Sequence, residues 1–247
     1  MLRAARHRLQ HRLAMHVPVA TRRLANPRPM VSFTFDDAPK SAATTGASML
    51  EAFGAFGTFY IAGSLVGTRA DDWTVLNSDD VLALHHEGHE IGCHTYSHIR
   101  TLELDEAAMA GEIARNHDFL QSIDPSIAPA NFAYPYGWGS YSRKGQLGTA
   151  FRSSRSIVPG INSGTVDLQF LRAVPLIEHK INGPMIEDLL DRTIASNGWL
   201  IFYTHDVTEN PSAYGVSSDL LAFAIGASHR RGIAIESVTE ALKCAGV

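Results

Sequence analysis

The feature of this sequence that most constrains its fold is the alternation of short apolar runs with longer helix-like stretches from residue 31 onward. The expected strands are Val31–Phe35, Thr58–Ile61, Glu90–Cys93, Asn131–Tyr134, Phe151–Ile157, Phe170–Leu176, Trp199–Thr204 and Ile233–Glu236. The clearest expected helices are Ser41–Phe53, Asp79–His86, Asp105–Ile123, Pro184–Ser196 and Ser217–Arg230. Strands that alternate with helices in this way form parallel sheets with crossover connections. The pattern predicts an α/β fold, either a barrel or an open doubly wound sheet.

The turn after the first expected strand favours the barrel. It holds Asp36, Asp37, Ala38 and Pro39, whereas a nucleotide-binding open sheet would carry a glycine-rich phosphate-binding turn there. In a barrel of parallel strands, functional side chains gather at the carboxyl ends of the strands. Candidate catalytic residues are therefore expected at these strand ends.

Composition and charge narrow the function classes. The chain has 247 residues, 45% hydrophobic and 19% charged, as expected for one globular enzyme domain with a substantial core. A net charge of −4 gives no reason to expect a nucleic-acid partner. The sequence has no apolar run typical of a secretory signal or a transmembrane helix, so a cytoplasmic location is expected.

Some residues that can bind metals are not expected to do so. Cys93 and Cys244 form no CxxC pattern, and they predict neither a metal site nor a disulfide framework. His85, His86 and His89 lie close together in the sequence, but glycines interrupt the helix that would align them. We expect these three histidines to be surface or packing residues.

Residues 1–28 differ from the rest of the chain because they contain several arginines and no acidic residue. A helix in this segment would place Leu2, Ala5, Leu9 and Leu13 roughly on one face. A basic amphipathic helix of this kind can lie on an anionic membrane surface. Because the apolar residues on this face are few, we favour a solvated arm, or a helix packed on the lower end of the barrel.

Two adjacent carboxylates, Asp36 and Asp37, follow the first expected strand. At a buried strand end they are costly unless a cation or hydrogen bonds compensate their charge. A metal ion bound by one carboxylate would leave the other free to act as a base. The alternative is a solvated loop or a helix N-cap ahead of Ser41, and the pair alone favours a functional role only weakly.

His94 and His98 lie four residues apart after the third expected strand. If this segment turns helically, both imidazoles lie on one face and can share a metal ion. Asp37 would add a carboxylate oxygen, and the remaining positions would stay open for water and substrate. That ligand set is typical of a catalytic rather than a structural metal site.

Two further strand ends carry residues of catalytic type. In Tyr134-Pro135-Tyr136-Gly137, proline and glycine make a shaped turn, where a backbone N–H can face a developing oxyanion and aromatic rings can stack on a sugar. His205 leaves the last long apolar strand, where a general acid would be useful. Taken singly, the turn is as readily explained by self-packing, and the histidine by a structural role.

Together and in this order, TFDD, HTYSH, YPYG and the late TH make the chain similar to the polysaccharide deacetylase family, also called the NodB-homology family or carbohydrate esterase family four. The similarity covers about Pro29 to Leu242. It implies an α/β fold of one domain, a distorted (β/α) barrel with about seven strands. It also divides the chain into a basic arm or helix, residues 1–28, and a catalytic domain, residues 29–247.

The resemblance implies a role for each matching residue. Asp37, His94 and His98 look like the ligands of one divalent transition metal, zinc or alternatively cobalt, nickel or manganese. Asp36 looks like the base that activates a metal-bound water, the Tyr136 N–H like the oxyanion donor, and His205 like the acid that protonates the leaving amine. The candidate substrate contacts are Tyr134, Pro135, Trp138 and Tyr203.

The sequence departs from the family pattern at Ala133. Many members carry an arginine at this position, held by an acid of a later Asp-Trp motif, and this arginine orients the base. Between Gly137 and His205 the chain has no Asp-Trp pair. We hypothesise that Arg155 or Arg172, each near an expected strand end, supplies the missing charge.

The sequence therefore predicts a metal-dependent hydrolase that removes acetyl groups from N-acetylated sugars of a polysaccharide, oligosaccharide or lipid-linked glycan precursor. An acetylated glycan is its expected partner. The alternatives are hydrolysis of another small amide or of an O-acetyl ester, and a catalytically silent glycan-binding module. The presence of a base, three metal ligands and an acid argues against the silent module, because binding alone does not require them.

Overall fold

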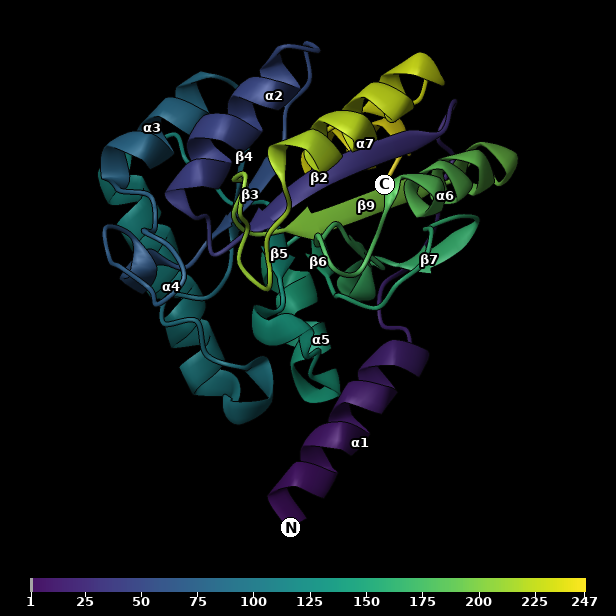
Figure 1. Ribbon diagram of the computed structural model, residues 1–247. Coiled ribbons are helices and arrows are strands. Elements are labelled where there is room, and N and C mark those ends of the chain that lie inside the picture. The colour runs from purple at the N-terminus through teal and green to yellow at the C-terminus, as the bar shows by residue number, and fades with distance from the viewer. Residues whose placement is uncertain (1) are drawn as a thin grey trace.

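The centre of the molecule is a curled parallel β-sheet (Figure 1), in a computed structural model that describes residues 2–247. Its strands are β2 (Met30–Asp36), β3 (Thr58–Ile61), β4 (Glu90–Cys93), β5 (Asn131–Ala133), β6 (Ser153–Arg155), β8 (Val174–Pro175), β9 (Trp199–Thr204) and β10 (Ala234–Ile235). They follow the order β6-β5-β4-β3-β2-β9-β8, and β10 pairs with the start of β2. Leu171, just before β8, forms a parallel bridge with Arg155 and so links the two edges of the sheet. The expected single-domain, distorted barrel is confirmed.

The helices that pack around this sheet are α2 (Ala47–Glu51), α3 (Ser78–His86), α4 (Glu106–Ile123), α5 (Tyr141–Ala150), α6 (Gly183–Ala195), α7 (Ser218–Arg230) and α8 (Val238–Cys244). Figure 1 shows α2, α6 and α7 over one face of β2 and β9. Four of the five expected helices are confirmed almost to the residue. The fifth, Ser41–Phe53, is divided, because a π-helical turn at Ala42–Gly46 precedes α2.

The side chains of β2 alternate between the two faces of the sheet, as the two-residue period of a strand requires. Val31, Phe33 and Phe35 belong to the main apolar cluster under the helices. Ser32 faces the barrel interior, where its hydroxyl accepts a hydrogen bond from Trp199 Nε1 at 2.9 Å. Asp36 continues this inner row, so the strand period itself directs its carboxylate into the barrel mouth.

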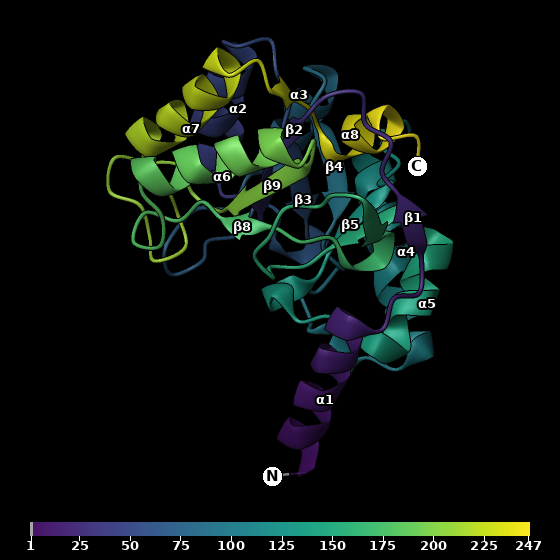
Figure 2. The same cartoon turned by 90° about the vertical axis from the view of Figure 1, so that its right-hand side faces the viewer.

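Helix α1 (Leu2–His16) projects away from the rest of the molecule, as Figures 1 and 2 show. Leu9 is 57% exposed, whereas Ala14, near the end of the helix, is 1% exposed. The His11 ring lies 4.9 Å from the Trp138 ring, and Gln10 Oε1 accepts a hydrogen bond from the Ser142 N–H at 3.0 Å. Trp138 and Ser142 follow the carboxyl end of β5. The helix therefore packs on the mouth side of the barrel, and its expected position at the lower end was wrong.

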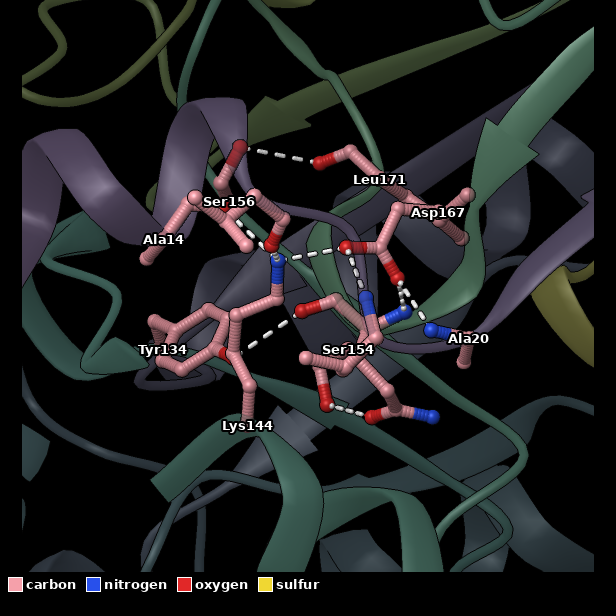
Figure 3. A network of polar contacts seen from close by, with 11 residues as sticks. Ala14, Ala20, Tyr134, Lys144, Ser154, Ser156, Asp167 and Leu171 are labelled. Atoms are coloured by element: carbon pink, nitrogen blue, oxygen red, sulfur yellow. Dashed lines mark hydrogen bonds and ion pairs between the residues drawn. The ribbon is translucent and has the colours of Figure 1, made fainter. Parts of the chain in front are cut away.

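The Lys144 ammonium, which is fully buried, fixes the end of α1 (Figure 3). It donates hydrogen bonds to the carbonyl oxygens of Ala14 at 2.7 Å and Val17 at 2.9 Å, and it pairs with Asp167. The last carbonyls of a helix have no partner within the helix, so Lys144 supplies one. Asp167 also accepts a hydrogen bond from the Ala20 N–H at 3.1 Å. The chain continues into β1 (Thr21–Arg23), which pairs antiparallel with β7 (Thr165–Asp167).

No helix in the described part of the chain is both long enough and apolar enough to cross a bilayer. Membrane contact through the basic residues of α1, the cytoplasmic location and the division of the chain at residue 28 stay predictions.

Replacing Lys144 by methionine is expected to lower the free energy of unfolding by about 3–5 kcal/mol, because Asp167 would then lose its buried cation. The Lys243→Met variant is the matched control, since Lys243 is an exposed lysine that pairs with Glu240 on the surface. The free energy of unfolding of this control variant should fall by no more than about 0.5 kcal/mol. Denaturant unfolding measures both values. Equal stabilities of the two variants would contradict the anchoring role of Lys144.

Candidate active site

A cavity of about 420 Å³ lies at the carboxyl ends of the strands. Among the sequence-predicted site residues, it is lined by Asp36, Asp37, His94, His98, Tyr136, Trp138, Tyr203 and His205. The strand ends identified in the sequence therefore converge on one place. Two predicted substrate contacts do not reach it. The Tyr134 side chain is 1% exposed and its hydroxyl donates a hydrogen bond to the Gln169 carbonyl at 2.9 Å, and Pro135 is buried beside it.

Unusual backbone conformations are concentrated around this cavity. A left-handed φ is unfavourable for any residue other than glycine. It occurs here at Asp37 (57°), Ala38 (42°), Thr95 (61°), His98 (51°) and Tyr136 (58°). Such conformations persist only where the surrounding structure enforces them, and they cluster at functional sites. In this molecule they turn the chain sharply at the ends of β2 and β4 and after β5, so that side chains face the cavity.

Asp37, His94 and His98 form a cluster with the composition of a metal site. Asp37 Oδ1 lies 3.0 Å from His98 Nε2 and 3.5 Å from His94 Nε2. Asp37 Oδ1 is nevertheless buried without a hydrogen bond, because the close nitrogen atoms are not aligned for one. The three potential ligand atoms thus lie close together without hydrogen bonds among them. This arrangement fits a shared metal cation better than it fits a hydrogen-bonded network.

The protonation states also fit a metal ion. Burial lowers the pKa of His94 to about 3 and that of His98 to about 4, so both imidazoles are neutral at pH 7. His94 Nδ1 lies 2.8 Å from the Ala133 carbonyl oxygen, to which it must donate its proton, and Nε2 is left with a lone pair. Burial raises the pKa of Asp37 to about 6, as expected for a carboxylate that lacks its counter-cation.

The loop that carries the two histidines is not helical, contrary to the helical turn considered from their spacing. The left-handed residues Thr95 and His98 fold it back, and the two imidazole rings lie 5.0 Å apart. Glu112 of α4 holds the loop, since its carboxylate accepts hydrogen bonds from the N–H groups of Tyr96 at 3.0 Å and Ser97 at 2.6 Å. Glu112 is thus a positioning residue that the sequence motifs did not reveal.

A second group, Glu51, Glu87 and His89, has ligand atoms at similar separations but does not fit a metal ion. His89 Nδ1 accepts a hydrogen bond from the Gly57 N–H at 3.0 Å. A neutral imidazole that accepts at Nδ1 carries its proton on Nε2, which here faces Glu51 Oε1 at 2.9 Å. Nε2 therefore has no lone pair for a metal, and His89 is a packing residue, as expected.

Arg155 of β6 supplies the positive charge missing at Ala133. Arg155 is 1% exposed, and its guanidinium donates a hydrogen bond to Asp36 Oδ1. Arg155 on β6 lies beside Ala133 on the neighbouring strand β5. The arginine therefore occupies the corresponding position on the next strand of the sheet. Its Cζ atom also lies 5.1 Å from the Tyr60 ring centroid and 5.3 Å from that of Tyr203.

Arg155 sets the charge of Asp36. Burial alone would raise the pKa of Asp36, but Arg155, with contributions from His94 and His205, more than offsets that effect. The pKa of Asp36 therefore lies below its usual value, and the carboxylate is ionised at neutral pH. Arg172, the other candidate, donates a hydrogen bond to the Pro159 carbonyl at 3.1 Å and does not line the cavity.

His205 faces Asp37 from the end of β9, with Nε2 4.0 Å from Asp37 Oδ2. Its Nδ1 lies 3.2 Å from the Tyr214 carbonyl, which can only accept, so Nδ1 carries a proton. Asp206 holds the following loop in place by accepting hydrogen bonds from the N–H and hydroxyl of Ser212 at 2.8 and 2.6 Å. Tyr214 of this loop lines the cavity.

Several cavity residues were not identified from the sequence. They are Trp73, Arg100, Ile157, Ile177 and Lys180. Trp73 packs 5.7 Å from the His205 ring, although it comes from the long loop after β3. No motif marks these residues as part of a site, because each lies in an irregular segment of the structure. Only the aromatic and cationic character of Trp73, Arg100 and Lys180 hints at a role.

The fold agrees with the comparison to known proteins. A model of the polysaccharide deacetylase family matches residues 23–146. The chain therefore belongs to the polysaccharide deacetylase family.

Two curated relatives are chitin deacetylases. The protein from Arthroderma benhamiae is 29% identical over 106 residues, which cover 43% of this chain and 27% of the relative. The protein from Pestalotiopsis sp is 32% identical over 105 residues, which cover 42% and 33%. The matched span thus represents a third or less of each of these relatives.

Two solved structures share the fold over most of both chains. The chitin deacetylase of Colletotrichum lindemuthianum has a TM-score of 0.64 at 18% identity and covers 88% of this chain and 89% of its own. A family 4 acetyl xylan esterase of Clostridium thermocellum, in complex with a cobalt ion, has a TM-score of 0.60 at 21% identity, with 88% and 92% covered.

Replacing Arg155 by methionine should raise the pKa of Asp36, because burial would then act on the carboxylate with less compensation. If Asp36 must be ionised for turnover, the acid limb of the kcat/KM profile moves up by about 1–3 pH units. The Arg172→Met variant is the control and should keep the wild-type profile. Steady-state rates between pH 4 and 9 on an acetylated sugar oligomer measure the shift. A larger shift in the control than in Arg155→Met would contradict this assignment.

Proposed function

We propose that the protein is a metal-dependent hydrolase that removes acetyl groups from N-acetylated sugars of a glycan. The observation that carries the proposal is the convergence of a base candidate, a metal-ligand cluster and an acid candidate in one cavity. Asp36 is ionised beside Arg155, Asp37 faces two neutral histidines, and His205 lies across from them. Membership of the polysaccharide deacetylase family supports the substrate class.

Asp37, His94 and His98 would hold one divalent transition metal, with zinc as the first candidate and cobalt, nickel or manganese as alternatives. When bound, such an ion lowers the pKa of water and polarises a carbonyl group. The cobalt ion in the Clostridium thermocellum structure supports a transition metal in this fold. The neutral state of His94 and His98 keeps both imidazoles ready to bind without first losing a proton.

Asp36 would act as the general base that takes a proton from the attacking water. A base must be ionised before reaction, and Arg155 keeps it so in spite of its burial. The guanidinium also fixes the carboxylate from one side, since it donates to Oδ1. The other oxygen, Oδ2, is then the one that can receive the proton.

His205 would protonate the nitrogen of the leaving amine. An amide nitrogen leaves only after it gains a proton, which requires an acid distinct from the base. The Tyr214 carbonyl accepts from Nδ1, so the imidazolium form can present its second proton on Nε2 toward the cavity. Asp36 and His205 approach the cavity from β2 and β9, which are neighbours in the sheet.

The backbone N–H of Tyr136 would stabilise the oxyanion of the tetrahedral intermediate. The left-handed conformation of Tyr136 (φ 58°, ψ 10°) reverses the chain at the cavity wall. Gly137 makes this turn possible, because a Cβ atom there would lie 2.1 Å from Ile157. Trp138 and Tyr203 line the same cavity and would serve as platforms for the sugar ring.

Hydrolysis of an O-acetyl ester is the second candidate, because the same residues can serve it with an easier leaving group. The acetyl xylan esterase that shares the fold favours keeping this alternative. The two candidates differ in their need for His205, since an alkoxide leaves more readily than an amine.

Release of acetate from oligomers of N-acetylglucosamine tests the proposal. The Asp36→Asn and His205→Ala variants should each lose at least about 10²-fold in kcat, because each lacks one proton-transfer group. The His86→Ala variant is the control, since His86 is an exposed histidine bound to Asp124 on the surface.

Acetyl xylan oligomers provide the second arm of this test. Turnover of the ester with no turnover of the amide, and with His205→Ala retaining the rate, would favour the esterase. No acetate from either substrate would leave a silent glycan-binding protein as the better account.

A further inference from the structure

Two exposed cations, Arg100 and Lys180, line the cavity that contains the candidate catalytic residues. Arg100 lies in the loop after β4 and Lys180 in the loop after β8, so the two charges come to the mouth from strands that are not neighbours. Within residues 2–247, neither side chain forms an ion pair, whereas the buried cations Lys144 and Arg155 are both paired. The charges of Arg100 and Lys180 are therefore available to a ligand.

The acidic residues around the cavity do not balance these charges. Asp36 and Asp37 are the only carboxylates among its described lining residues. Asp36 is paired with Arg155, so Asp37 is the one lining carboxylate left to oppose the two cations. Glu178, two residues before Lys180, accepts a hydrogen bond from the Ser217 N–H at 2.8 Å instead. The mouth is thus positive in a chain with 25 acidic and 21 basic residues, so the overall composition does not account for it.

The position of Arg100 suits the recognition of an anion close to the reacting group. Its Cζ atom lies 4.3 Å from the centroid of the Tyr136 ring, and that ring lies 4.5 Å from the His98 ring. Stacking on an aromatic face restricts the guanidinium and orients its N–H groups. A planar guanidinium binds carboxylates and phosphates through two parallel hydrogen bonds, which a neutral sugar hydroxyl cannot match.

We propose that the substrate carries an acidic group, a carboxylate or a phosphate, on or next to the acetylated sugar, and that Arg100 and Lys180 bind it. This inference rests on the proposed deacetylase function and specifies the substrate class for the same cavity. The two cations act as specificity-determining residues, since a neutral glycan leaves both charges without a partner. Attraction of an anion by an uncompensated positive mouth also raises the rate of encounter, and salt weakens that effect.

The test compares three substrates with the zinc-loaded protein. They are a neutral oligomer of N-acetylglucosamine, the same oligomer with a phosphate ester, and an oligomer in which N-acetylglucosamine alternates with a uronic acid. For each enzyme, the readout is the ratio of kcat/KM for an acidic substrate to kcat/KM for the neutral one. The wild-type ratio should exceed one and fall as sodium chloride is raised. Whichever acidic substrate shows the higher ratio identifies phosphate or carboxylate as the group bound.

The variants Arg100→Gln and Lys180→Gln should each reduce this ratio about tenfold, mostly through KM, because each removes one charge-assisted hydrogen bond. The Arg172→Gln variant, which changes an arginine outside the cavity, should keep the wild-type ratio. A wild-type ratio at or below one, or equal losses on neutral and acidic substrates, would overturn the inference but leave the deacetylase proposal intact. No turnover of any of the three substrates would overturn both.

Discussion

The buried carboxylates at the end of β2 determine how the rest of the site is built. Asp36 is 5% exposed, and an ionised carboxylate in that position is unfavourable unless nearby charges compensate it. Arg155 provides this compensation from β6, held between the rings of Tyr60 and Tyr203. Asp37 has no comparable partner and faces His94 and His98 instead. One carboxylate is thus satisfied by the protein, and the other is left for an added cation.

The different surroundings of Asp36 and Asp37 require that the neighbouring strands and loops have fixed positions, and several contacts of the fold fix them. The alternation of β2 places Ser32 and Asp36 on the inner face, and Gly92 on β4 makes room for Tyr60, because a Cβ atom there would lie 2.5 Å from the ring. Glu112 holds the histidine loop through backbone N–H groups. Outside the matched family span, α1 packs His11 against Trp138 and is itself fixed by Lys144.

The sequence predicted the parallel core and the site motifs because both depend on local patterns. Buried strands appear as uninterrupted apolar runs, and β2, β3, β4 and β9 were predicted within a residue of their observed bounds. Helix α5 was missed because Gly145 and Gly148 interrupt a mostly polar segment with low helix propensity. The β1–β7 pair was missed because its strands are short, and the β1 side chains are all exposed.

Other features of the site depend on contacts between residues that are far apart in the sequence, which local patterns do not reveal. Arg155 and Arg172 were equivalent candidates, since only the pairing of Ala133 with Arg155 across β5 and β6 distinguishes them. The burial of Tyr134 likewise depends on residues distant in the sequence, since its ring packs 5.8 Å from that of Phe170 and its hydroxyl bonds to the Gln169 carbonyl. Trp73, Arg100 and Lys180 reach the cavity from irregular loops. In such loops the spacing of residues in the sequence does not predict where their side chains point.

The proposed hydrolysis depends on a metal ion bound by Asp37, His94 and His98, and elemental analysis of the purified protein tests this binding most directly. After incubation with divalent ions and removal of the excess, the wild type should retain about one transition-metal ion per chain. The Asp37→Ala and His98→Ala variants should lose it, and Glu51→Ala, in the second group of possible ligands, should not. A wild-type chain without metal, or metal retained in both site variants, would contradict the account.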